Sequence, residues 1–67
     1  MKNRKITIED IDILGKEMFG DQVRFNLWME TPNYALGYNN PKDLLVDDVG
    51  IKLVYETLMR IDNGIFC

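Results

Sequence analysis

Apolar residues recur with a helical period along most of the chain, separated by polar positions. The first such stretch begins at Thr7, followed three residues later by Asp10 in a variant of the capping box that starts helices. The apolar residues that then recur at helical spacing are Ile11, Leu14 and Met18. Within this stretch Gly15 predicts the close approach of another helix. Gly20 predicts the helix end, because glycine is preferred just beyond a helix C-terminus.

A second, shorter helix is predicted directly after the first. Asp21 is its expected N-cap. The helix is expected to end near Glu30, because Thr31 precedes Pro32 and a residue before proline is pushed away from helical backbone angles. The residues predicted to share its buried face are Val23, Leu27 and Trp28. Phe25 falls to the side of that face.

A single helical turn and then another short helix are predicted in the middle of the chain. In the first, Thr31 is the expected cap, Pro32 takes the first helical position, and Gly37 closes the turn. In the second, Asn40 is the expected cap and Pro41 takes the first position. The residues expected to face inward are Ala35, Leu36, Leu44 and Leu45.

The longest helix is predicted over residues 48–62, which would span roughly 22 Å at ~1.5 Å per residue. Asp47 and Asp48 stand at its start and Arg60 in its last turn, where the helix dipole favours these charges. The apolar stripe comprises Val54, Leu58 and Ile61, widened by Ile51 and Tyr55. The predicted fold is therefore all-α. We expect a small bundle of about four to five helices, with a long C-terminal helix and short helical turns before it.

Sixty-seven residues form one domain at most, so residues 1–67 are interpreted as a single domain. Residues 1–6 are expected to form a flexible basic arm, which holds three of the eight basic residues. From Ile6 onward, five basic residues face eleven acidic ones. An acidic body of this kind suits an electropositive partner. We do not expect this chain to bind DNA by itself.

The residue inventory excludes several chemistries. The chain has no histidine, no serine and one cysteine, Cys67. These absences exclude a Cys/His zinc site and acyl transfer by a serine or cysteine with histidine. The acidic pairs are interpreted as helix caps and solvated faces. We therefore predict no catalytic, cofactor or metal residues, and no enzyme.

No apolar run approaches the ~20 residues of a membrane span, so no membrane partner is expected. The start of the chain does not have the pattern of a secretory signal. A lone thiol without such a signal is typical of the reducing cytoplasm, where we expect the protein to reside.

Aromatic residues are the candidate contacts. Trp28 is interpreted as a core residue rather than a binding hot spot. Tyr34 and Tyr38 flank Gly37 on an exposed turn, where partner contact and plain surface are equally open. Near the end of the sequence, Phe66 either folds back on the core or stays available to a pocket of a partner.

Several short motifs occur in one order, and together they cover about residues 9–67. The pieces are FGD (19–21), Trp28, TPNYALG (31–37), NPKDLL (40–45), Gly50 and LMRIDNGIF (58–66). This arrangement resembles the toxin-binding domain of the Xre/MbcA/ParS-like antitoxins. Two positions depart from the family pattern: Tyr38 stands where a second glycine is frequent, and Asp62 where a glutamate is frequent.

The resemblance implies a partner-binding function without chemistry. Such antitoxins neutralise RES-domain toxins, which consume NAD, and their C-terminal segment approaches the active-site cleft of the toxin. The positions this implies for toxin binding are Arg60, Asn63, Gly64, Ile65, Phe66 and Cys67. Tyr34 and Tyr38, singled out by their exposed turn rather than by the resemblance, are candidates for a secondary contact. Family members usually carry an N-terminal helix-turn-helix region, for which residues 1–20 are too short.

A second hypothesis is a small homo-oligomerising helical module. It would serve as a subunit of a transcription regulator or as an orphan interaction protein. A chain of this length buries only roughly 60% of the surface that its unfolded form exposes, so its core is marginal and a homodimer would extend it.

Overall fold

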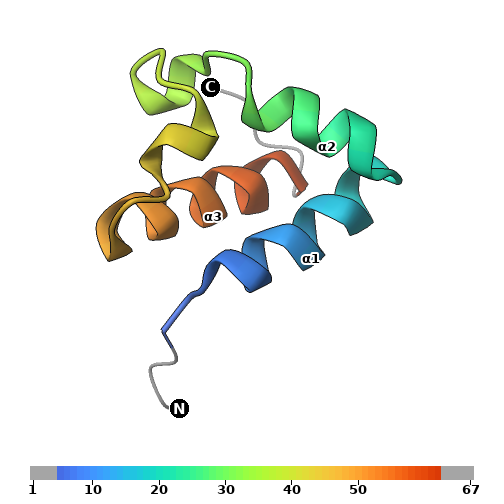
Figure 1. The fold of residues 1–67 in the computed structure, drawn as a ribbon, viewed down its shortest axis with the longest axis horizontal. Helices are drawn as coiled ribbons and strands as arrows, with labels where there is room; N and C mark the ends of the chain where they lie inside the picture. Colours follow the sequence, from blue (N-terminus) through green and yellow to red (C-terminus); the bar gives the residue numbers. More distant parts are fainter. Residues whose placement is uncertain (1–4, 63–67) are drawn as a thin grey trace.

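The computed structural model describes residues 5–62. The elements follow in the order α1 (Ile8–Phe19), α2 (Gln22–Met29), the 3-10 helices η1 (Tyr34–Leu36) and η2 (Pro41–Leu44), and α3 (Asp48–Asp62) (Figure 1). Within this range there is no strand, only an isolated β-bridge between Asn33 and Asn39. The helical fold is confirmed, but the expectation of four to five helices was wrong. Three α-helices form, because the two middle segments each stop after a single 3-10 turn.

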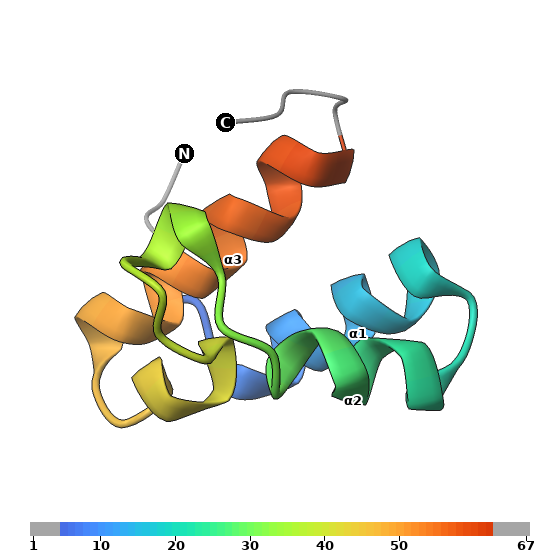
Figure 2. The ribbon, with the colours of Figure 1, turned by 90° about the horizontal axis from the view of Figure 1, so that it is seen from above.

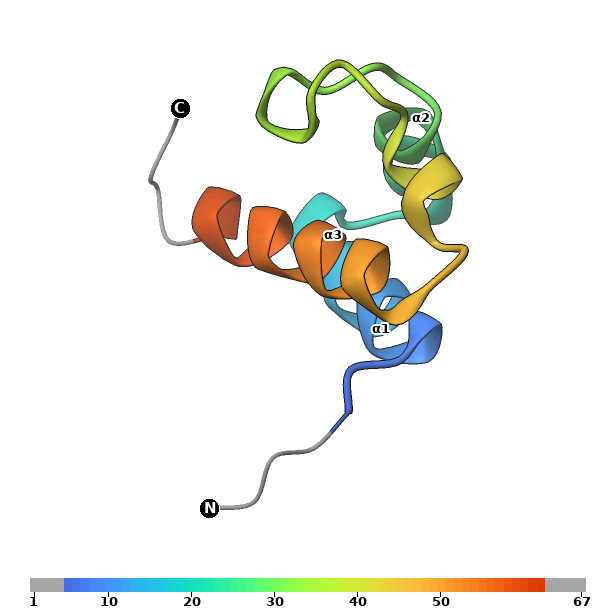
Figure 3. The same ribbon diagram turned by 90° about the vertical axis from the view of Figure 1, so that its left-hand side faces the viewer.

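α1 and α2 run antiparallel as a hairpin, and α3 packs most extensively against α1 (Figure 2). η1 and η2 both contact α3, and η2 also contacts α2. Figure 3 shows η1 and α1 on opposite sides of α3. The long last helix therefore lies between the first helix and the middle turn.

The core lies where the three helices meet. Its buried apolar residues are Ile11, Phe25, Met29, Leu36, Val54 and Leu58, with further half-buried apolar residues packed around them. Ile11 supplies the contribution of α1, and Val54 and Leu58 that of α3, as the helical spacing predicted. Full burial of each large side chain of this kind contributes about 1.5–3 kcal/mol.

The predicted buried face of α2 was wrong. Val23 and Leu27 are 77% and 67% exposed, whereas Phe25 and Met29 are buried. The reason is Gly15 on α1: a Cβ at this position would overlap the ring of Phe25. The missing side chain makes room for the ring, so Phe25 turns α2 toward α1, and the expected close approach at Gly15 is confirmed.

Trp28 is half-buried, and its ring centroid lies 6.1 Å from that of Phe19. The interpretation of Trp28 as a core-packing residue is thereby confirmed.

Caps fix the helix ends as predicted. The Thr7 side chain accepts a hydrogen bond from the Asp10 amide, and the Asp10 carboxylate accepts from the Thr7 amide at 2.9 Å. Gly20 ends α1 in the left-handed conformation, with φ of 83°. The amide of Arg24 donates to Asp21 at 2.7 Å. Each bond satisfies a backbone donor or acceptor that the end of a helix leaves unpaired.

The start of the first middle turn differs from the expectation. Thr31 does not cap it; its hydroxyl donates to the carbonyl oxygen of Leu27 at 2.6 Å and closes α2 instead. The cap of η1 is Asn33, whose side chain accepts from the amide of Ala35 at 2.8 Å. Leu36 is buried as predicted, but Ala35 is exposed, because the tight 3-10 turn directs only one side chain inward.

The second middle turn keeps the predicted backbone arrangement with a weaker cap. Asn40 occupies the N-cap position and Pro41 follows it, but the Asn40 side chain makes no capping hydrogen bond. Leu44 and Leu45 are half-buried rather than fully buried. The carbonyl oxygen of Leu44 lies directly against Gly50, where a Cβ would overlap it. Gly50 therefore lets η2 pack on the first turn of α3.

Candidate functional site

Arg60 lies in the last turn of α3 and is exposed. It shares an outward stripe at four-residue spacing with Lys52 and Glu56, both also exposed. Within residues 5–62 no salt bridge engages Arg60. Its guanidinium thus remains free to reach a carboxylate or phosphate of another molecule.

The other residues that the resemblance assigned to toxin binding lie outside the described residues. They are Asn63, Gly64, Ile65, Phe66 and Cys67. The described chain reaches Asp62 as helix, so α3 leads directly to this segment. The two alternatives for Phe66, its own core or a partner, stay a prediction.

Tyr34 and Tyr38 form an exposed aromatic pair. Their ring centroids lie 5.5 Å apart with an interplanar angle of 79°, which is an edge-to-face contact. The side chains are 67% and 68% exposed. The structure thus brings the two secondary candidates together, whereas within the described range no hydrogen bond, ion pair or ring contact joins them to Arg60.

The backbone of residues 33–39 explains this pairing. The amide of Asn33 donates to the carbonyl oxygen of Asn39 at 3.1 Å. The amide of Tyr38 donates to the carbonyl oxygen of Asn33 at 2.8 Å. These bonds bend the chain back on itself, with Gly37 at φ 68° and Tyr38 at φ 66°. A left-handed backbone costs a non-glycine residue roughly 1–2 kcal/mol. In the described chain Tyr38 is the only non-glycine residue with positive φ.

A groove between α1, α2 and η2 was not anticipated from the sequence. Its volume is about 210 Å³; its apolar floor includes Ile11, Phe25 and Met29, and Asp12 and Asn26 line its polar edge. It was missed because its walls come from three elements whose packing the sequence pattern does not give.

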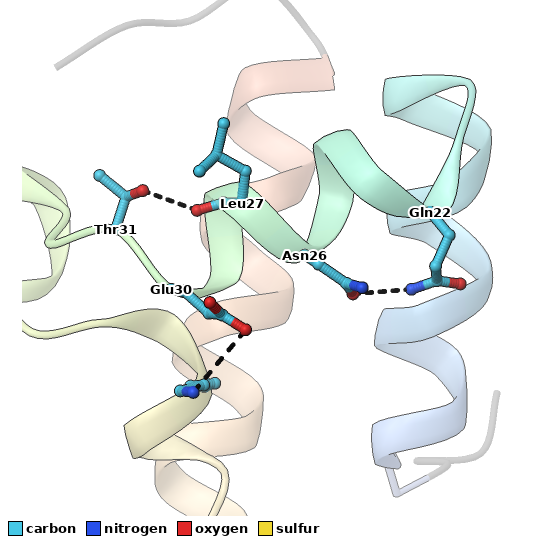
Figure 4. A network of polar contacts seen from close by, with 6 residues as sticks. Gln22, Asn26, Leu27, Glu30 and Thr31 are labelled. Carbon is cyan, nitrogen blue, oxygen red and sulfur yellow. Dashed lines mark hydrogen bonds and ion pairs between the residues drawn. The ribbon is translucent and has the colours of Figure 1, made fainter.

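Three residues that line this groove, Asn26, Glu30 and Lys42, also make polar contacts along α2 and at its end (Figure 4). Gln22 donates through its side-chain amide to Asn26 at 2.8 Å. The Glu30 carboxylate oxygen Oε2 lies 3.8 Å from Lys42 Nζ, and this ion pair links the end of α2 to η2. Both members of this ion pair are exposed, so it adds little to stability. The groove is open, with no unpaired buried side-chain polar atom among the described residues.

The described residues hold no group of three or more acidic, histidine or cysteine side chains placed to bind a metal ion. Among the same residues no helix is both long and apolar enough to span a membrane. The features that stand out in the described part of the chain are therefore surfaces: the free Arg60, the tyrosine pair and the groove.

Comparison with known proteins adds a family to this picture. Residues 14–64 match the family described as the antitoxin Xre/MbcA/ParS C-terminal toxin-binding domain. The "Antitoxin Xre" of Yersinia enterocolitica serotype O:8 / biotype 1B (strain NCTC 13174 / 8081) is 32% identical over 56 residues. That similarity covers 84% of this chain and 35% of the relative, so the chain spans about a third of the length of the relative. No solved structure matches the chain.

The match covers most of the chain, and the chain belongs to the antitoxin Xre/MbcA/ParS C-terminal toxin-binding domain family. The resemblance noted from the sequence motifs is thereby confirmed at the level of the family. The matched range includes Arg60, Asn63 and Gly64 and ends before Ile65.

Proposed function

We propose that this domain neutralises a RES-type, NAD-consuming toxin by docking its C-terminal segment at the active-site cleft of the toxin. The observation that carries the proposal is membership of a toxin-binding antitoxin family over residues 14–64. The domain would act by occupying the cleft, with no chemistry of its own. The residues proposed to face the toxin are Arg60, Asn63, Gly64, Ile65, Phe66 and Cys67.

The arrangement of the described residues supports this role. α3 is anchored in the core by Val54 and Leu58, both completely buried. Arg60 lies one half-turn beyond Leu58 and is exposed and free of ion pairs within the described range. A helix held rigidly at its middle can present its end to a partner without losing much conformational freedom, which favours binding.

The test removes the segment and keeps the fold. We expect that a chain lacking Ile65 to Cys67 retains its helical circular-dichroism signal but neutralises a co-expressed RES-type toxin at least tenfold less effectively. Arg60→Ala is the second variant, and Lys52→Ala, on the same stripe two turns earlier, is its matched control. If the truncated chain protects cells as well as the full chain does, the docking of this segment is wrong.

Outward-facing apolar residues support a second candidate, a homodimer that acts as a regulatory or interaction module. Val23 and Leu27 are exposed on α2, and Val49 and Leu53 on α3, each pair at four-residue spacing. Burying such stripes between two copies would add apolar area that a small domain lacks. Sedimentation equilibrium tests this candidate: a strict monomer at all concentrations excludes it, and a dimer that Leu27→Glu dissociates supports it.

A further inference from the structure

We infer that Tyr34 and Tyr38 form a second toxin-contacting site, which receives a basic side chain of the toxin. This inference rests on the proposed function, since the toxin is the partner. It adds a contact on the turn 33–39, which lies earlier in the sequence than the C-terminal segment.

The exposure of the pair indicates a contact surface. Both tyrosines are about two-thirds exposed. The edge-to-face geometry at 5.5 Å leaves ring faces uncovered. Within residues 5–62 neither phenol hydroxyl takes part in a hydrogen bond. The two side chains are held by each other and otherwise face solvent.

The backbone conformation gives an independent indication. Tyr38 has a φ of 66°, where glycine is strain-free and a bulky side chain is an outlier. Its side chain is not buried, so the core gains little in exchange for this strain. Strained residues with no packing role concentrate at sites of recognition. The strained backbone at Tyr38 therefore favours a role for its ring in contact with another molecule.

The chemistry of the pair and the charge of the domain point to a cation. Uncovered tyrosine faces attract lysine and arginine side chains, particularly when binding removes water. Residues 5–62 contain eleven acidic and six basic residues, so the domain attracts an electropositive surface.

The experiment compares variants of the full chain in calorimetric titrations with the purified RES-type toxin. Tyr34→Leu combined with Tyr38→Gly removes both rings, and Tyr34→Phe combined with Tyr38→Phe keeps them without the hydroxyls. Ile13→Ala is the control, because Ile13 is an exposed apolar residue on α1, which lies on the opposite side of α3 from η1 (Figure 3). Thermal unfolding followed by circular dichroism accompanies each titration.

We expect the ring-deleting variant to bind the toxin about tenfold more weakly, a loss of about 1.4 kcal/mol. The phenylalanine variant and Ile13→Ala should stay within about twofold of wild type. Tyr38→Gly alone should not lower the unfolding midpoint, because it relieves the left-handed strain. A loss of binding with an unchanged midpoint separates contact from folding.

Each contrary outcome has its own meaning. Wild-type chain that fails to bind the toxin overturns the proposed function and this inference together. Wild-type binding that the ring-deleting variant matches overturns the inference alone. Equal losses in the phenylalanine and ring-deleting variants show that the hydroxyl groups, rather than the ring faces, make the contact, and that result also overturns the inference as stated.

Discussion

Two regions of this domain use the same residue types for opposite purposes. In the helical core, Gly15 and Gly50 leave out a Cβ so that the Phe25 ring and the Leu44 carbonyl can pack tightly. In the turn 33–39, Gly37 supplies a left-handed backbone, and two aromatic rings remain exposed. Glycine therefore allows close packing in the core, whereas in the turn it allows a backbone conformation that leaves two aromatic side chains exposed. Burial, rather than residue type, separates the two.

The largest difference between the regions is expected for their aromatic rings. Phe25→Ala should lower the free energy of unfolding by about 3–5 kcal/mol, since it empties a buried site. Tyr34→Ala should cost only about 0.5–1.5 kcal/mol, the value of one exposed ring pair. Urea unfolding followed by circular dichroism measures both. Equal losses in the two variants would show that the turn belongs to the cooperative core.

Replacing a glycine by alanine should also destabilise the core more than the turn, but by a smaller difference. Gly50→Ala should destabilise by about 3 kcal/mol, because the new Cβ meets the backbone carbonyl of Leu44, which cannot rotate away. Gly37→Ala should cost about 1 kcal/mol, because the nearest atom leaves room and only the positive φ opposes it. Thermal midpoints rank the pair, and a reversed ranking would contradict the tight packing of η2 on α3.

The smallest difference in stability between the two regions is expected when the N-caps of their helices are removed. Thr7→Ala should lower stability by about 1 kcal/mol, which corresponds to about 4–8 °C in the midpoint of a domain of this size. Asn33→Ala, which removes the cap of the three-residue η1, should cost less, because little helix depends on it. A larger effect at Asn33 than at Thr7 would mean that the turn stabilises the helices around it.

The sequence predicted the ends of the helices better than their faces. Thr7, Gly20 and Asp47 act through bonds within a few residues, so local pattern reveals them, and α3 has the predicted bounds. The face of α2 could not be found in this way. Apolar residues occur around most of this eight-residue helix, so periodicity does not select one side. The selection comes from Gly15, which lies on another helix.

The features of the candidate site also differ in whether local sequence could predict them. Motif order identified the family, and the sequence placed Tyr34 and Tyr38 beside Gly37 on an exposed turn, as observed. Their edge-to-face contact and the φ of Tyr38 depend on the bridge between Asn33 and Asn39, which no local pattern reveals. The groove between α1, α2 and η2 requires three packed elements and was likewise out of reach.

Because α1 packs on α3, the core of the domain cannot form completely during translation until α3 has been synthesised. Ile11 and Phe25 leave the ribosome well before Val54 and Leu58, which cover the same core. At roughly 5–20 residues per second, the stretch from Met29 to Leu58 takes about 1.5–6 s to synthesise. During that interval the nascent hairpin of α1 and α2 has an uncovered apolar face, accessible to chaperones and proteases.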